Sequence, residues 1–137
     1  MTKVPLCVHD QTLAGESLHE LTLEFLTERV TVRELIRERV HHEVKEFNRR
    51  ADEVVFRGLV QPEQAERVLN GRRTEYRLKR HEPLDWAAQF ARAIEGFSSN
   101  RYFIIIDDKQ AESLDQEFVI GPATSVSFVK LVPLVGG

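Results

Sequence analysis

The 137-residue sequence predicts an α+β fold in which a β-sheet packs on one main helix. Three patterns predict it: alternating apolar residues near the N-terminus, a long amphipathic segment after them, and apolar runs of strand length near the C-terminus. Hydrophobic residues make up 42% of the chain and charged residues 30%, which is near the globular average and argues against a disordered chain. We therefore expect one domain, residues 1–137, with a single core.

The first half of this fold is an N-terminal hairpin followed by a helix. Apolar side chains occupy every second position in residues 4–9 and again in residues 21–25, with a glycine-containing polar segment between them. Thr31-Val-Arg-Glu34 then forms a capping box, in which the hydroxyl and the carboxylate satisfy amides at a helix start. Apolar residues recur at intervals of three and four from Val32 to Phe47, so we expect a helix over residues 32–48.

Residues 49–101 predict a folded, mainly helical insertion before the interior strand. A short extended segment is expected at residues 54–56, and a short strand within residues 74–80. Pro62 suits the first turn of a helix and Asn70-Gly71 suits its end, so a second helix is expected between them. Asp85 is expected to cap a third helix. Its predicted apolar face consists of Leu84, Ala87, Phe90, Ala91, Ile94 and Phe97.

The C-terminal third predicts the remaining strands and a tail. Residues 102–106 form a continuous apolar run, typical of an interior strand, and residues 125–132 predict the last strand. In that strand Val126 and Phe128 should face the helix, whereas Val129 and Leu131 should lie on the other sheet face. Residues 133–137 then run through Pro133 to Gly136-Gly137, which have no side chains to contribute to a core. We expect this tail to act outside the fold, on a partner.

The composition of the chain indicates which partners and which cellular compartment to expect. The net charge of −3 provides no overall field that would attract nucleic acid or an anionic membrane, so neither is expected as a partner. The single Cys7 cannot form an internal disulfide, which fits a reducing compartment. No signal-peptide pattern and no apolar segment of membrane-spanning length occurs. We expect a cytoplasmic protein.

No pattern in the sequence predicts an enzyme, a metal site or a bound cofactor. The five histidines lack metal-ligand spacing, since His41 and His42 are adjacent and diverge around a helix. Cys7 has no acid-base partner nearby in sequence, which favours a buried structural thiol. Asp107 and Asp108 are also adjacent, which favours a turn over paired acid-base catalysis. Phosphate-binding glycine loops and serine nucleophile motifs are missing from the sequence.

Two stretches of this sequence resemble the β-grasp carriers and modifiers. One is the N-terminal hairpin and helix, and the other runs from Tyr102 to Gly137 as an interior strand, an acidic turn, a short strand at 118–120 and a last strand ending in Gly-Gly. This family includes ubiquitin-like proteins, the small subunit of molybdopterin synthase and the thiamine-pathway sulfur carrier. The resemblance covers about two thirds of the chain, and residues 49–101 have no counterpart in the smallest members. It implies a β-grasp sheet with a helical insertion.

The resemblance also implies a function for the tail. Gly136 and Gly137 would be the adenylation and conjugation site, where the Gly137 carboxylate attacks the α-phosphate of ATP inside an activating enzyme. The acyl group would then pass through a thioester to lysines of target proteins, or accept sulfur as a thiocarboxylate. Val129, Leu131, Leu134 and Val135 are candidate partner-binding residues beside the tail. Burial of Val129 and Leu131 beneath the insertion is the alternative.

We favour a ubiquitin-like modifier over a sulfur carrier, because an extra layer of about fifty residues suggests added recognition. A binding module with an accidental diglycine is the third candidate. The bacterial relatives would imply an activating enzyme, a conjugating enzyme and a metal-dependent deconjugating peptidase as partners. All catalysis would then belong to those partners.

Overall fold

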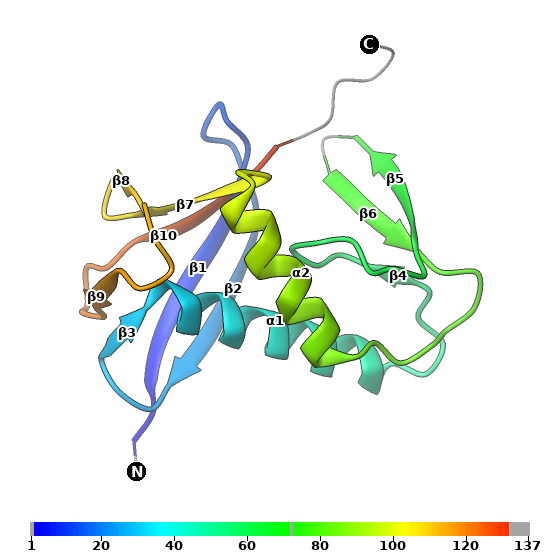
Figure 1. The fold of residues 1–137 in the computed structure, drawn as a ribbon, viewed down its shortest axis with the longest axis horizontal. Helices are drawn as coiled ribbons and strands as arrows, with labels where there is room; N and C mark the ends of the chain where they lie inside the picture. The colour runs from blue at the N-terminus through cyan, green and yellow to red at the C-terminus, as the bar shows by residue number, and fades with distance from the viewer. Residues whose placement is uncertain (1, 72, 132–137) are drawn as a thin grey trace.

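The computed structural model describes residues 2–71 and 73–131, which form two helices and ten strands (Figure 1). The α+β class predicted from the sequence is confirmed. The elements are β1 (Val4–Gln11), β2 (Ser17–Phe25), β3 (Arg29–Thr31), α1 (Val32–Arg49), β4 (Val55–Phe56), β5 (Glu66–Asn70), β6 (Arg73–Arg77), α2 (Trp86–Ser98), β7 (Tyr102–Ile106), β8 (Lys109–Gln110), β9 (Glu117–Val119) and β10 (Val126–Lys130).

A five-stranded sheet with the order β2-β1-β10-β7-β8 forms the main layer. The first and last strands are central neighbours and pair in parallel, with Val8 opposite Val126, whereas the other strand pairs are antiparallel. The helix α1 crosses one face of this sheet (Figure 1). The predicted hairpin, interior strand and last strand are confirmed, each to within a few residues of its expected bounds.

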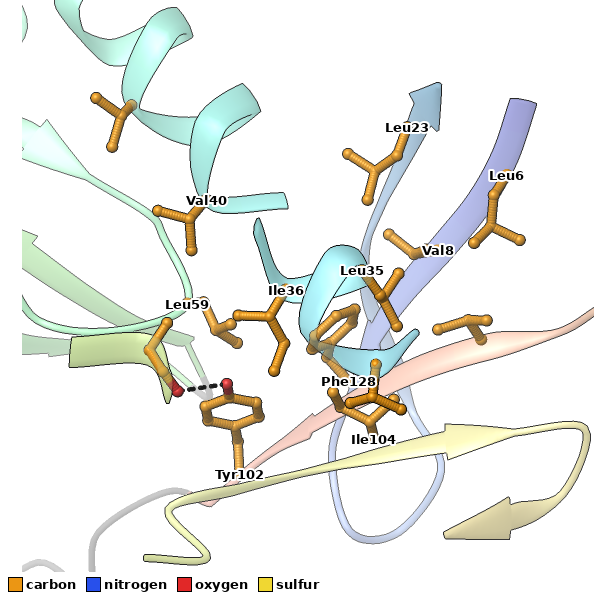
Figure 2. Packing of buried hydrophobic residues seen from close by; sticks show 14 of the residues in the cluster. Leu6, Val8, Leu23, Leu35, Ile36, Val40, Leu59, Tyr102, Ile104 and Phe128 are labelled. Carbon is orange, nitrogen blue, oxygen red and sulfur yellow. Dashed lines mark hydrogen bonds between the residues drawn. The ribbon is translucent and has the colours of Figure 1, made fainter. Parts of the chain in front are cut away.

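The helix α1 begins and packs as its sequence predicts. The Thr31 hydroxyl accepts a hydrogen bond from the Glu34 amide at 3.1 Å, which satisfies an amide of the first turn. Leu35 and Ile36 have no exposed surface, and Figure 2 shows them close to Phe128 and Ile104 of the sheet. Fully burying such a side chain contributes about 1.5–3 kcal/mol. The apolar stripe of α1 therefore supplies the core of the main layer.

The expected second helix is wrong. Residues 66–70 form β5, which pairs antiparallel with β6 in a small sheet of order β4-β6-β5. The apolar stripe of Ala65, Val68 and Leu69 is narrow, and Leu69 remains 36% exposed, so little burial would stabilise a helix here. Gly71 adopts a φ of +66° in the turn between the two strands. Asn70-Gly71 therefore serves a hairpin turn, and does not end a helix.

The third predicted helix is confirmed as α2, and its expected apolar face is confirmed in part. Leu84 is buried, and Phe90, Ile94 and Phe97 pack partly buried against the core. The Asp85 side chain caps α2 by accepting from the Ala88 amide at 3.1 Å. Ala87 and Ala91, both expected in the apolar face, are exposed. The buried positions within α2 are Gln89, Ala93 and Gly96.

Small residues explain why Ala93 and Gly96 lie on the buried face of α2. Ala93 and Gly96 let the helix backbone approach β7 closely, and a Cβ added at Gly96 would lie 3.2 Å from Cε1 of Tyr102. The Tyr102 hydroxyl donates to the Ala93 carbonyl oxygen at 2.7 Å (Figure 2). Phe90 remains only partly buried and stacks on Trp86 at 5.7 Å between ring centroids. A close backbone contact thus determines which face of α2 is buried.

One hydrophobic cluster joins the insertion to the main layer. It contains insertion residues such as Phe56, Leu59 and Tyr76 together with residues of α1 and the five-stranded sheet. The rings of Phe47 in α1 and Phe56 in β4 meet edge to face, with centroids 5.5 Å apart. The insertion is therefore packed on the core.

We expect Tyr102→Phe to lower the free energy of unfolding by about 0.5–1.5 kcal/mol, because the variant keeps the ring but loses the hydroxyl bond to Ala93. Urea titration followed by circular dichroism measures this change. The matched control is Tyr76→Phe, whose hydroxyl has no hydrogen bond among the described residues. An equal loss in both variants would contradict the role given to the Tyr102–Ala93 bond.

Candidate functional site at the end of the last strand

The end of β10 lies where three separate parts of the chain meet. In Figure 1 it emerges beside the β1–β2 turn, the end of α2 and the β5–β6 hairpin, at the opposite end of the molecule from the N-terminus. The Arg73 guanidinium of β6 donates a hydrogen bond to the Leu18 carbonyl oxygen of β2. The insertion hairpin is thus attached to the strand pair next to the start of the tail.

The predicted adenylation and partner-binding residues fall partly outside the part of the chain that the structure describes. Leu134, Val135, Gly136 and Gly137 all belong to residues 132–137, which are not described. Leu131 is the last described residue and is 37% exposed, as a docking residue requires.

The expectation that Val129 is an exposed apolar residue needs correction, because it is only 6% exposed. Its Cα partner in β7 is Phe103, and its partner in β1 is Gln11, so it lies between neighbours on both sides of a central strand. Neighbouring side chains on the same sheet face cover one another in this way. Phe103 and Ile105 of β7, which alternate with the buried residues of that strand, are partly exposed.

Beneath the sheet, a fully buried arginine organises a group of charges. Arg39 of α1 has no exposed surface and forms a bidentate pair with Asp10 of β1, in which Nη2 lies 2.7 Å from Oδ2. Its Nε donates to Oε2 of Glu43 at 3.0 Å. The guanidinium also lies 4.5 Å from the centroid of the Phe128 ring in β10. Two carboxylates and an aromatic face therefore compensate one buried cation.

The buried charges shift the pKa values of Asp10 and Arg39. Burial by itself would raise the pKa of Asp10, but the Arg39 guanidinium outweighs it and lowers that pKa below the usual value. Burial disfavours the charged form of Arg39, whereas Glu43 and Asp10 favour it, and the net effect raises its pKa. Asp10 and Arg39 are consequently both ionised at neutral pH in the folded protein.

The same group extends to the insertion and to the end of β10. Glu43 Oε1 accepts from the Leu59 amide at 3.2 Å, and Lys130 Nζ donates to the Gly58 carbonyl oxygen at 2.8 Å. Burial lowers the pKa of Lys130, and the charge of Arg39 adds in the same direction. The last residue of β10 is therefore held by a hydrogen bond to the insertion.

A cleft of about 370 Å³ lies beside the end of β10, lined by residues 59–61, the β5–β6 hairpin, α2 and the ends of β7 and β10. Its lining includes Leu131 and carries more positive than negative charge. The charged lining residues are Arg67, Arg92, Arg101, Lys130 and Glu95. The Nε of Arg92 donates to the Gln61 carbonyl oxygen at 2.6 Å. The surroundings of Leu131 thus favour an acidic partner surface.

On the opposite sheet face, Cys7, His9 and Glu20 lie together, which sequence spacing did not predict. Their ligand atoms are all within 4.8 Å of one another. Cys7 is half-buried, not buried as expected, because strand alternation turns it away from the core. Burial, the hydrogen bond from Cys7 to Glu20 and the charge of Glu20 all raise the pKa of the thiol, which disfavours a nucleophilic thiolate.

The acidic turn has the structural role predicted for it. Asp107 and Asp108 have φ angles of +48° and +68°, in the left-handed region that Asp tolerates better than most residues. Asp107 Oδ1 also accepts from the Ser125 amide at 2.9 Å, joining the β7–β8 turn to the start of β10.

Comparison with known proteins finds no matching family model, no matching curated protein and no matching solved structure. Among residues 2–71 and 73–131, neither helix is long and apolar enough to cross a membrane.

We expect Asp10→Asn to lower the free energy of unfolding at neutral pH by about 3 kcal/mol, since removing one partner leaves the buried Arg39 with a single carboxylate. The folded pKa of Asp10 lies below the reference value of 3.8. The ionised Asp10 therefore contributes fully to the free energy of unfolding above pH 3.8, and this contribution is lost as the pH falls through the folded pKa. Urea titrations across this acid range should show the two proteins converging in stability.

The control for this variant is Glu117→Gln, which removes the exposed Arg29–Glu117 pair. Exposed pairs contribute roughly 0–1 kcal/mol, so little change is expected. A loss in Asp10→Asn no larger than in this control would contradict the central role of the buried pair.

Proposed function

We propose that this chain is a β-grasp, ubiquitin-like modifier, activated by adenylation of its C-terminal glycine and joined to lysines of target proteins. On this proposal Gly137 carries the reactive carboxylate, and the chemistry requires it to be the terminal residue of the mature chain. The chain itself brings the acyl group, while the catalytic groups belong to an activating enzyme and a conjugating enzyme.

The observation that carries the proposal is the position of the last strand. β10 pairs in parallel with β1 at the centre of the sheet, after a hairpin and a helix that crosses it. This order of strands is the one expected for a β-grasp fold. β10 ends at Lys130 as a central strand of the sheet, and Gly136-Gly137 follow within seven residues in the sequence.

The chemistry explains why two glycines would end such a chain. A carboxylate is a poor acyl donor, so its oxygen first attacks the α-phosphate of ATP, forming an acyl-adenylate and releasing pyrophosphate. A cysteine thiolate of the activating enzyme then displaces AMP to form a thioester, and a lysine amine displaces the thiolate to form an isopeptide. Residues without Cβ atoms can enter the narrow channel that excludes water from these intermediates.

The surroundings of Leu131 support a docking role beside this tail. Leu131 is exposed and lines the basic cleft, and Lys130 before it is held by Gly58. A fixed start for the tail reduces the conformational entropy lost when a partner binds it. We therefore assign first contact with the activating enzyme to Leu131 and the cleft, and not to Val129.

Conjugation should leave a recognisable peptide on the target. Trypsin cleaves after Lys130, so a modified lysine should carry residues 131–137 as a branched remnant. The chain with an N-terminal tag is expressed in its native cells, purified under denaturing conditions, digested and analysed by mass spectrometry. The expected result is this remnant, linked through Gly137 to lysines of other proteins.

Two variants serve as controls for conjugation. Deleting Gly136 and Gly137 should abolish the remnant, and so should adding one alanine after Gly137, which blocks the reactive carboxylate. Neither change should alter thermal stability, because terminal glycines contribute nothing to a core. Sulfur in place of a Gly137 oxygen would instead indicate a sulfur carrier. An unchanged carboxylate in the native cells would contradict both functions.

We expect Leu131→Asp to reduce conjugate formation by about tenfold or more, equivalent to roughly 1.4 kcal/mol of lost docking. Its unfolding temperature should stay unchanged, since surface substitutions usually alter stability by less than about 0.5 kcal/mol. Val129→Asp is the matched comparison two residues earlier. It should destabilise the fold, because it buries an unpaired charge. Full conjugation by Leu131→Asp would remove this residue from the docking surface.

A further inference from the structure

We propose that Cys7, His9 and Glu20 form a binding site for a divalent, borderline-soft cation such as Zn²⁺. The site lies on the sheet face opposite α1, and none of its three residues lines the cleft beside Leu131. The proposal concerns a binding activity that the modifier function does not require.

Strand geometry brings the three residues together. Cys7 and His9 are two positions apart in β1, so their side chains point to the same face of the sheet. Glu20 in β2 is the direct Cα partner of His9, and β1 and β2 are antiparallel. The carboxylate can therefore reach both neighbouring side chains of the adjacent strand.

The distances suit a tetrahedral ion with little rearrangement. Cys7 Sγ lies 3.2 Å from Glu20 Oε1, and His9 Nδ1 lies 3.7 Å from Glu20 Oε2. Zinc-ligand bonds of about 2.0–2.3 Å at tetrahedral angles place neighbouring ligand atoms about 3.3–3.6 Å apart. With all three ligand atoms within 4.8 Å of one another, side-chain rotations alone can complete the site.

An ion can reach this site from solvent. The His9 side chain is 36% exposed and the Glu20 side chain is 63% exposed, while Cys7 is half-buried. The residues that alternate with them, Leu6, Val8 and Asp10, are buried on the α1 side. The ligands thus stand on a rigid strand pair whose other face is anchored in the core, which favours a defined geometry.

The ligand set selects the class of cation. A thiolate, an imidazole nitrogen and a carboxylate together suit Zn²⁺, whereas Mg²⁺ and Ca²⁺ prefer sites made only of oxygen. Binding replaces the thiol proton: the S–H bond of Cys7 breaks, a sulfur–metal bond forms and the proton leaves to solvent. Three protein ligands leave a fourth position for water or for a side chain of a partner.

The test uses Co²⁺ as a spectroscopic probe for Zn²⁺, with the untagged, reduced, full-length chain. We expect saturation at one Co²⁺ per chain, with a thiolate-to-cobalt charge-transfer band and the intense visible bands of tetrahedral coordination. Zn²⁺ should then displace Co²⁺ and remove these bands. Zn²⁺ should also raise the unfolding temperature, because an ion bound only by the folded state stabilises it.

Single substitutions assign the ligands. Cys7→Ser should abolish the charge-transfer band, and His9→Gln and Glu20→Gln should each weaken Zn²⁺ binding by more than the roughly 10- to 100-fold typical of losing an outer partner. Matched controls are Glu24→Gln, which lies on the same face of β2, and His42→Ala in α1. Both controls should bind the ion like the wild-type chain.

Unfolding temperatures measured without metal show whether each variant keeps the fold, so loss of binding cannot be confused with loss of structure. No cobalt spectrum in the wild-type chain would overturn the proposal. So would a spectrum that Cys7→Ser retains, or an equal loss of binding in the control variants. Failure of conjugation would leave these results unaffected, because the tail is not part of the site.

Discussion

The buried positive charge of Arg39 must be balanced by partners, and the rest of the structure depends on this constraint. Arg39 lies in the core without exposed surface, where an unpaired charge would cost several kcal/mol. Asp10 from the first strand, Glu43 from its own helix and the Phe128 ring from the last strand surround it. These contacts are possible only when α1 lies in one register across the parallel β1–β10 pair. Hydrophobic packing alone would specify that register less strictly.

This compensation also explains how the insertion is placed. Glu43 uses its second oxygen for the Leu59 amide, so the partner of Arg39 holds the insertion as well. Lys130, next to Leu131, donates to Gly58 one residue earlier in the insertion. The insertion is thus connected to the charged core and to the start of the tail through two adjacent residues. A change in the buried pair can therefore reach the proposed docking surface through a short chain of contacts.

Sequence patterns correctly predicted the helix and strands whose apolar residues recur with a regular spacing or form one continuous run. They failed where contacts between distant parts of the chain determine the secondary structure or the buried face. The N-terminal hairpin and β10 show clear alternation, α1 shows helical spacing and β7 is a continuous apolar run, and all four are present. β5 was mistaken for a helix, because Asn70-Gly71 suits a helix end and a hairpin turn equally well. The buried face of α2 was predicted only in part, because Gly96 packs closely on Tyr102, a contact that periodicity within the helix does not report.

In the candidate sites, too, sequence spacing does not reveal which charged and polar residues become neighbours in the fold. Asp10 and Arg39 are 29 positions apart in the sequence, so no spacing rule connects them. Cys7, His9 and Glu20 become neighbours only through the register of β1 and β2, which the sequence outlines but does not specify. In β1, Asp10 alternates with Cys7 and His9, so one strand serves the buried pair on one face and the proposed metal site on the other. The proposed functions can therefore be separated by substitution, because adjacent residues of a strand act on opposite faces of the sheet.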